Sequence, residues 1–333
     1  MTVQPAAPKV AELWRFPVKS MGGCQVDRVA VDARGVHADR LWAVRDVDKG
    51  VTASARRIPA LLGCTARYLA EPDEQAGPGR VPAVAVTFPD GRELTSDDPG
   101  IHAALSELAG RRVRLTALPP VGDTSAHRMK MVDSLDNYRP EQVRKDFGLA
   151  DGEPLPDTSV FPAKDIITLA RYSTPPGTFV DLAPLHLMST ASLRNLTVGA
   201  EVLDVRRFRP NVLIDLAGKE RSFPESDWVG GELSIGSARL KVTMPTIRCV
   251  VPTRPQPGIE LDRTITRALA ERTDRFLGVY IDVRTPGVLS VGDEVRVRAA
   301  EPPTAVQRAT MSVTRSATRA GQWLLEQTVM RVR

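Results

Sequence analysis

The sequence predicts a mainly β protein with minor α content, on three observations. Proline and glycine are plentiful in the 333 residues, at 27 and 24, whereas aromatic residues make up only 5%. Short apolar–polar alternations recur between Gly, Pro and Asp turn signals. No internal repeat of fixed period is visible. Many short strands with regular turns are typical of closed or nearly closed barrels, and the length suits two domains.

The first expected domain, a β-barrel-like unit, spans residues 9–118. Its first strand lies within residues 9–20, where apolar residues alternate. A Pro-Asp-Gly sequence at 89–91 predicts a hairpin, and the run 101–110 predicts a short helix that its final glycine ends. A strand at 112–118 completes this domain.

Residues 119–180 are expected to form a connecting segment packed over the cleft between the two domains. Pro, Gly, Asp and Ser are frequent there, and the periodicity is weak. We therefore predict a long connection for this stretch rather than regular elements.

The second expected domain spans residues 181–299 and is a β-barrel with short helices. Its strands are separated by glycine-containing turns. Residues 261–273 predict an amphipathic helix. Its Leu261, Ile265 and Leu269 fall on one face.

The C-terminal tail, residues 300–333, differs in composition from the rest. It holds five arginines against two glutamates, and a short apolar stripe accompanies them. We expect a terminal helix docked on the protein or frayed from it, with a basic partner-binding helix as the alternative.

Composition excludes several classes of function. The net charge is only +5, and no basic run is interleaved with stacking aromatics, which argues against nucleic-acid binding. No apolar run approaches the roughly 20 residues of a membrane span, and no signal peptide is visible. The cysteines at 24, 64 and 249 form neither a disulfide framework nor an iron–sulfur spacing. A cytoplasmic protein fits these features best.

The stretch 244–253 is the main candidate for a reactive or metal-binding site. Cys249 lies there between Pro245 and Pro252, which predict a stiff loop. The adjacent Arg248 would favour the thiolate, the form that binds metal or attacks. A small buried apolar cysteine is the alternative.

Several motifs, taken in order, resemble the MOSC family, named for the C-terminal domain of molybdenum cofactor sulfurases. The resemblance is to its two-part form, a MOSC N-terminal β-barrel followed by a MOSC β-barrel, as in the amidoxime-reducing component and its bacterial relatives. The motifs are FPVKS at 16–20, ADRLWAV at 38–44, APLHLMSTASL at 183–193, RRFRPNVLID at 206–215, TIRCVVP at 246–252 and LGVYIDVRTPGVLSVGDEV at 277–295.

The resemblance implies a molybdenum cofactor, which is molybdopterin carrying the metal. Cys249 is the implied catalytic residue and the thiolate that coordinates molybdenum, a role that suits a soft sulfur donor. A phosphate is best held by Arg and Lys. On their own, Lys19 and Arg40 would be read as solvated surface charges. The implied cofactor-binding residues are Lys19, Ser20, Arg40, Asp181, Arg209, Asn211, Thr246 and Arg248.

The resemblance also implies an oxidoreductase that reduces a small N-oxygenated (N-hydroxylated) substrate. Electrons would come from a separate redox protein, because the sequence has no dinucleotide-binding glycine motif and no cysteine cluster. Two alternatives stay open, a sulfur-carrier or molybdenum cofactor handling protein that uses Cys249, and a non-enzymatic binding member of the fold. We expect Lys19, Ser20, Arg40 and Arg209 to converge from both domains on one anionic ligand.

Overall fold

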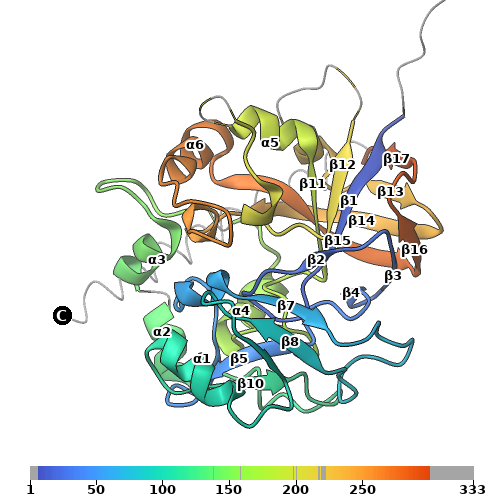
Figure 1. Ribbon diagram of the computed structural model, residues 1–333. Helices are drawn as coiled ribbons and strands as arrows, with labels where there is room; N and C mark the ends of the chain where they lie inside the picture. Colours follow the sequence, from blue (N-terminus) through green and yellow to red (C-terminus); the bar gives the residue numbers. More distant parts are fainter. Residues whose placement is uncertain are drawn as a thin grey trace, which may run out of the picture.

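The computed structural model describes residues 7–300 except 138, 158, 198, 200, 217 and 219–222. The protein is mainly β, as predicted, and its parts form two lobes (Figure 1). All of the predicted tail after residue 300 lies outside the described residues. None of the helices in the described part of the chain has the length and apolar character that a bilayer crossing requires.

Short strands make up most of the regular structure. The strands before residue 118 are β1 (Lys9–Arg15), β2 (Cys24–Gln25), β3 (Arg28–Asp32), β4 (Gly35–Val36), β5 (Trp42–Asp46), β6 (Val51–Thr52), β7 (Thr65–Tyr68), β8 (Val84–Thr87), β9 (Glu93–Thr95) and β10 (Val113–Ala117). Those after residue 180 are β11 (Leu185–Ser189), β12 (Val212–Asp215), β13 (Glu232–Ile235), β14 (Ala238–Ile247), β15 (Phe276–Thr285), β16 (Gly287–Ser290) and β17 (Val295–Arg298).

Helices are short and lie between the strands. The α-helices are α1 (Ile101–Ala109), α2 (Met131–Asn137), α3 (Pro140–Phe147), α4 (Ala163–Arg171), α5 (Thr190–Leu196) and α6 (Thr264–Thr273). The 3-10 helices are η1 (Pro59–Gly63), η2 (Val205–Arg207), η3 (Pro224–Trp228) and η4 (Val251–Thr253).

One large sheet organises the C-terminal lobe. Among the described residues it has eight strands, in the order β17-β13-β14-β15-β11-β12-β1-β2. Along β14 every second residue is buried, which is the period of two expected of a strand with one face on a core. Leu187, Leu240 and Ile281 from this sheet are fully buried in that core.

The N-terminal strands are shared between the two lobes. Strand β1 pairs with β12, and β3 pairs with β16, so Val10 and Val29 are buried in the core of the large sheet. Val18 and Val44 instead belong to the separate core of the N-terminal lobe. The chain therefore crosses from one lobe to the other just after β1, in the segment that carries the FPVKS motif.

The predicted helices are present, with one boundary corrected. Helix α1 ends at Gly110, which has a left-handed φ of 62°. In α6, Ile265 and Leu269 are buried as expected, but Leu261 is 46% exposed and precedes the helix. The reason is Asp262, whose carboxylate accepts a hydrogen bond from the Thr264 backbone N–H at 2.9 Å and so starts the helix later.

The segment 119–180 contains three helices, α2, α3 and α4, that the sequence pattern did not predict. Contacts with the C-terminal lobe hold α3 and the turn that follows it. Arg275 of the C-terminal lobe donates to Glu153 Oε1 at 2.8 Å and to the Phe147 carbonyl at 2.9 Å. The Asp146 carbonyl accepts from the Val250 N–H at 2.8 Å, which fixes α3 beside the cysteine loop.

His127 is fully buried in this segment, and its burial should make the stability of the protein depend on pH. Its Nδ1 is 2.8 Å from Thr174 Oγ1, and its Nε2 accepts from the Gly177 N–H. Burial lowers the pKa of His127 below the usual 6.5, so the unfolded chain binds a proton first as the pH falls.

We predict that the free energy of unfolding falls from pH 6.5 downward, by up to about 1.4 kcal/mol per pH unit from this residue. His127→Gln removes that part of the slope. Urea unfolding between pH 7.5 and 5.5 measures it, and equal slopes in both proteins contradict the prediction.

Candidate functional site

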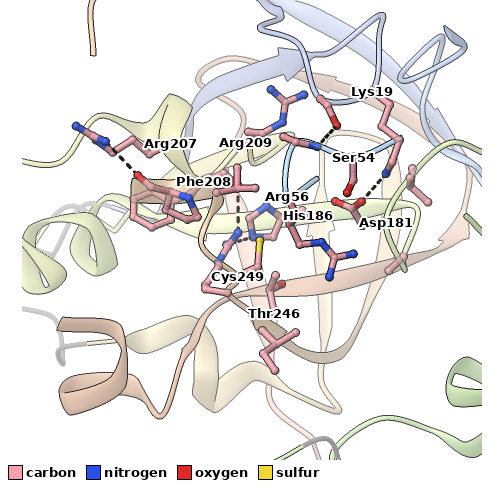
Figure 2. A pocket seen from close by; sticks show the side chains of 18 of the residues that line it. Lys19, Ser54, Arg56, Asp181, His186, Arg207, Phe208, Arg209, Thr246 and Cys249 are labelled. Carbon is pink, nitrogen blue, oxygen red and sulfur yellow. Dashed lines mark hydrogen bonds and ion pairs between the residues drawn. The ribbon is translucent and has the colours of Figure 1, made fainter. Parts of the chain in front are cut away.

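A cavity lies where the two lobes meet. It holds about 830 Å³ of empty space, its open mouth included. All nine residues proposed from the sequence line it, from segments more than 200 positions apart: Lys19, Ser20, Arg40, Asp181, Arg209, Asn211, Thr246, Arg248 and Cys249 (Figure 2). The expected convergence of the cations on one cleft is therefore observed.

Lys19 lies in the segment that crosses between the lobes. Its side chain is only 4% exposed, and its ammonium forms an ion pair with Asp181, which precedes β11. The protein around Asp181 acts to raise the pKa of its carboxyl, but the charge and hydrogen bond of Lys19 outweigh this and hold the pKa well below its usual range. Burial lowers the pKa of Lys19, and the charge and hydrogen bond of Asp181 act against this shift. The pair ties the lobes together.

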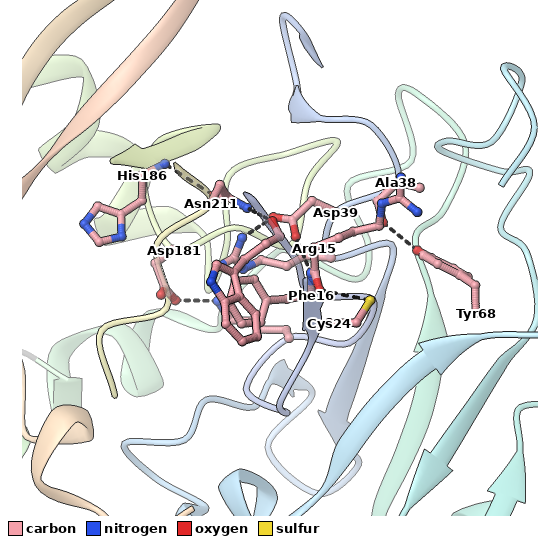
Figure 3. Close-up of polar contacts among 12 residues, drawn as sticks. Arg15, Phe16, Cys24, Ala38, Asp39, Tyr68, Asp181, His186 and Asn211 are labelled. Carbon is pink, nitrogen blue, oxygen red and sulfur yellow. Dashed lines mark hydrogen bonds and ion pairs between the residues drawn. The ribbon is translucent and has the colours of Figure 1, made fainter. Parts of the chain in front are cut away.

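Two arginines lie against the ring of Phe16, which stands beside Asp39 (Figure 3). The guanidinium carbons of Arg40 and Arg209 lie 4.8 and 4.3 Å from its centroid. Asp39 positions this group, since it pairs with Arg40 and accepts from the Phe16 backbone N–H at 2.7 Å. Burial, assisted by the charge of Arg40, lowers the pKa of Arg209 to about 9. Arg209 Nη2 is buried without a hydrogen-bond partner in the described structure.

The backbone of this cationic group is strained. Ser20, Arg40 and Arg209 have φ values of 70°, 51° and 55°, in the left-handed region that non-glycine residues rarely adopt. Each such residue costs about 1 kcal/mol or more and persists only where its surroundings impose it. Three of them in one cavity indicate that the cations are held in place before any ligand arrives.

Asn211 lines the cavity and also braces its walls. Its Oδ1 accepts from the His186 N–H at 3.3 Å, and its Nδ2 donates to the Trp14 carbonyl at 3.2 Å. Among the described residues Asn211 Nδ2 donates to this one carbonyl, and because the nitrogen carries two hydrogens, a ligand could accept the second.

Arg248 has a different environment from the one expected. Its guanidinium is buried and donates to the carbonyls of Leu277 and Phe208 at 2.8 and 3.1 Å, and to His186 Nε2 at 2.5 Å. Burial and the charge of Arg248 together lower the pKa of His186 well below the usual 6.5, so this imidazole is neutral. Arg248 therefore orders the cavity floor through its hydrogen bonds.

Cys249 lies at the start of the loop that follows β14. Burial raises the pKa of its thiol, and among the neighbouring cations Arg56 opposes this more than Arg248 does. The loop begins later than predicted, because β14 continues through Pro245 to Ile247 with a register shift at that point. Beside it, Thr246 Oγ1 is buried without a partner in the described structure.

Comparison with known protein families identifies two matching domains in the chain. A family model of the MOSC domain matches residues 175–296, and a model of the MOSC N-terminal beta barrel domain matches residues 7–97. The chain belongs to the MOSC family.

The MOSC chain is similar to several curated proteins. Mitochondrial amidoxime reducing component 2 of Bos taurus is 25% identical over 307 residues, 86% of this chain and 82% of the relative. Mitochondrial amidoxime-reducing component 1 of Homo sapiens is 27% identical over 318 residues, with coverage of 86% and 82%. Molybdenum cofactor sulfurase of Bos taurus is 34% identical over 98 residues, which are 27% of this chain and 10% of that protein.

Among the residues of the MOSC cavity that the sequence analysis did not propose are His186, Tyr280, Phe208 and Arg56. The first three stand inside the motifs quoted above, so their signal was present but carried no stated role. Arg56 stands in no such motif. It belongs to the loop between β6 and η1, and only the packing of the lobes brings it to the cavity.

A substitution at Gly278 would test how tightly the cavity floor around His186 is packed. Its φ is 75°, and an added Cβ would lie 2.6 Å from His186 Nε2 and 2.6 Å from Met188 Cγ. We predict that Gly278→Ala lowers the free energy of unfolding by about 2–4 kcal/mol, from backbone strain and overpacking together.

The matched control is Gly91→Ala. Gly91 has a φ of 83° but no atom within 4 Å of the added Cβ, so only the strain of about 1 kcal/mol remains. Urea unfolding of both variants gives the comparison. Equal losses would show that the floor around His186 is loosely packed.

Proposed function

We propose that this MOSC protein holds a molybdenum cofactor in the cavity and is an oxidoreductase for small N-oxygenated (N-hydroxylated) substrates, with electrons from a separate redox protein. One observation carries the proposal. The cavity brings a single loop thiol, Cys249, together with a pre-set group of cations from both lobes. The names of the amidoxime-reducing relatives support the substrate class.

The residues of the cavity fit such a cofactor. Buried polar atoms in proteins are nearly always hydrogen-bonded, yet Arg209 Nη2 and Thr246 Oγ1 have no partner in the described structure. A polar, anionic ligand would satisfy both. Cys249 offers the soft sulfur that molybdenum favours.

Each residue then has a defined task. Lys19, Ser20, Arg40 and Arg209 would hold the terminal phosphate, which guanidinium and ammonium groups bind well. Asn211 and Thr246 would bind the pterin, with Asp181 keeping Lys19 charged. When bound, the cofactor supplies the redox chemistry.

Cys249 must lose a proton to act as the ligand. Because burial raises the pKa of its thiol, metal binding would release that proton, and the loading of the site should be pH-dependent. The thiols of Cys24, Cys64 and Cys249 are all free. A reducing compartment suits them, so a cytoplasmic location belongs to the proposal.

A second candidate is sulfur or cofactor handling by Cys249. The similarity to part of a molybdenum cofactor sulfurase favours it. Mass spectrometry of the purified protein separates the two, since a persulfide on Cys249 without bound molybdenum supports handling.

We predict that Cys249→Ala abolishes bound molybdenum and reductase activity while the fold survives. The variant removes the one proposed protein ligand, but a single loop side chain contributes little to the core of either lobe. Elemental analysis, pterin fluorescence after oxidation and turnover of an amidoxime decide the outcome.

Two other cysteines serve as controls. Cys24→Ala and Cys64→Ala should keep the metal, and Cys64→Ala should cost about 1 kcal/mol because that side chain is fully buried. Wild-type activity in Cys249→Ala would refute the assignment.

Electron supply gives a further prediction. The sequence lacks a dinucleotide-binding glycine motif and a cysteine cluster, so NADH alone should give no turnover. Addition of a redox protein and its reductase should restore it. Steady oxidation of NADH by the purified protein with an amidoxime alone would show that the partner is unnecessary.

A further inference from the structure

Arg56 is a cation of the cavity to which the proposed cofactor cradle gives no task. It follows β6, and it reaches the cavity between Asp181 and Cys249 (Figure 2). Its side chain is 40% exposed, whereas Lys19 is 4% exposed. Arg56 therefore stands at the mouth, where a ligand enters.

The other cations of the cavity are held by protein groups, and Lys19, Arg40 and Arg209 also have a place in the proposed phosphate cradle. Lys19 pairs with Asp181, and Arg40 pairs with Asp39. Arg207 donates to the carbonyls of Pro252 and Glu260. Arg248 donates to the carbonyls described above and to His186. Arg209 stacks on Phe16.

Within the described part of the chain, the ion contact of Arg56 is a loose one, with Asp146 of α3. Its Nη1 lies 3.7 Å from Asp146 Oδ2, while Arg57 Nη2 lies 3.1 Å from the same oxygen. The other oxygen, Oδ1, accepts from Gln142 Nε2 at 2.9 Å. The Asp146 carboxylate is thus satisfied without Arg56, whose planar group can turn to a ligand at little cost.

The charges around Arg56 keep it a cation. A guanidinium is always protonated in proteins, and the carboxylates of Asp146 and Asp181 lie near enough to favour its charge. Six cations line the cavity against one carboxylate, Asp181. The resulting positive potential attracts anions, and a guanidinium can form a bidentate pair with a carboxylate or similar oxyanion.

We propose that Arg56 recognises an anionic group on the substrate at the cavity mouth, so that the preferred substrates are compounds carrying a carboxylate or similar oxyanion. The N–O chemistry of those compounds rests on the proposed function, whereas anion recognition by Arg56 does not. Arg56 is thereby a specificity-determining residue beside the reactive thiol.

Alkylation of Cys249 tests this without any cofactor. The full chain is made in a host that cannot synthesise the pterin, and iodoacetate and iodoacetamide are compared at Cys249 by peptide mass spectrometry. Both reagents react with the same thiolate, so the ratio of their rates is independent of the fraction ionised. The ratio reports only how strongly the site attracts the anionic reagent.

We expect Arg56→Gln to lower the iodoacetate-to-iodoacetamide ratio about fivefold, the size expected of one partly exposed charge. Arg56→Lys should retain most of the ratio. Arg57→Gln, the matched control on the same carboxylate, should leave it unchanged. Added salt should shrink the difference between wild type and Arg56→Gln.

A second arm uses the cofactor-loaded protein. Calorimetry compares the binding of benzamidoxime with that of its 4-carboxylate, and Arg56→Gln should weaken only the carboxylate. The proposal is overturned if Arg56→Gln and Arg57→Gln have the same effect on the alkylation ratio. It is also overturned if Arg56→Gln loses bound pterin while the ratio stays at the wild-type value, because Arg56 then belongs to the cofactor cradle.

The two proposals fail separately. If the wild-type protein binds no molybdenum but Arg56→Gln still lowers the alkylation ratio, the proposed function is wrong and anion recognition stands.

Discussion

The buried ammonium of Lys19 is the constraint on which the arrangement of the two lobes depends. An ammonium that is almost fully buried must be paired, since an unpaired buried charge costs several kcal/mol. Asp181, from the start of the C-terminal lobe, supplies the partner. Lys19 itself lies in the segment that leaves β1, a strand of the large sheet, to enter the N-terminal lobe. The pair therefore links the two lobes at the point where the chain crosses.

The same crossing explains why the cavity is so positively charged. It brings Lys19 and Arg40 into one cavity with Arg209, and both guanidinium groups lie against the ring of Phe16. Like charges at this spacing repel, and the left-handed backbone at Arg40 and Arg209 adds strain. A bound anion would offset this repulsion between the cations. This is the physical reason to expect a phosphate-bearing ligand.

The sequence predicts part of the secondary structure and most of the proposed site, but not every residue of the cavity. Alternation and turn residues predicted the β-rich lobes, and α1 was predicted because Gly110 gives a clear end signal. The helices of 119–180 were missed because they are only seven to nine residues long and lie between stretches rich in Pro, Gly and Asp. The charge of Arg248 acts to lower the pKa of Cys249 in the expected direction, but its hydrogen bonds to distant carbonyls could not be predicted from the sequence. Arg56 could not be found, since only lobe packing brings it near Cys249.

The central claim is that this cavity holds a molybdenum cofactor through Cys249. The most direct test is elemental analysis of the wild-type chain purified from a host with ample molybdenum, together with pterin fluorescence after oxidation. The account predicts metal and pterin in equal amounts, approaching one of each per chain. Folded protein that carries neither, even after incubation with free cofactor, would contradict it.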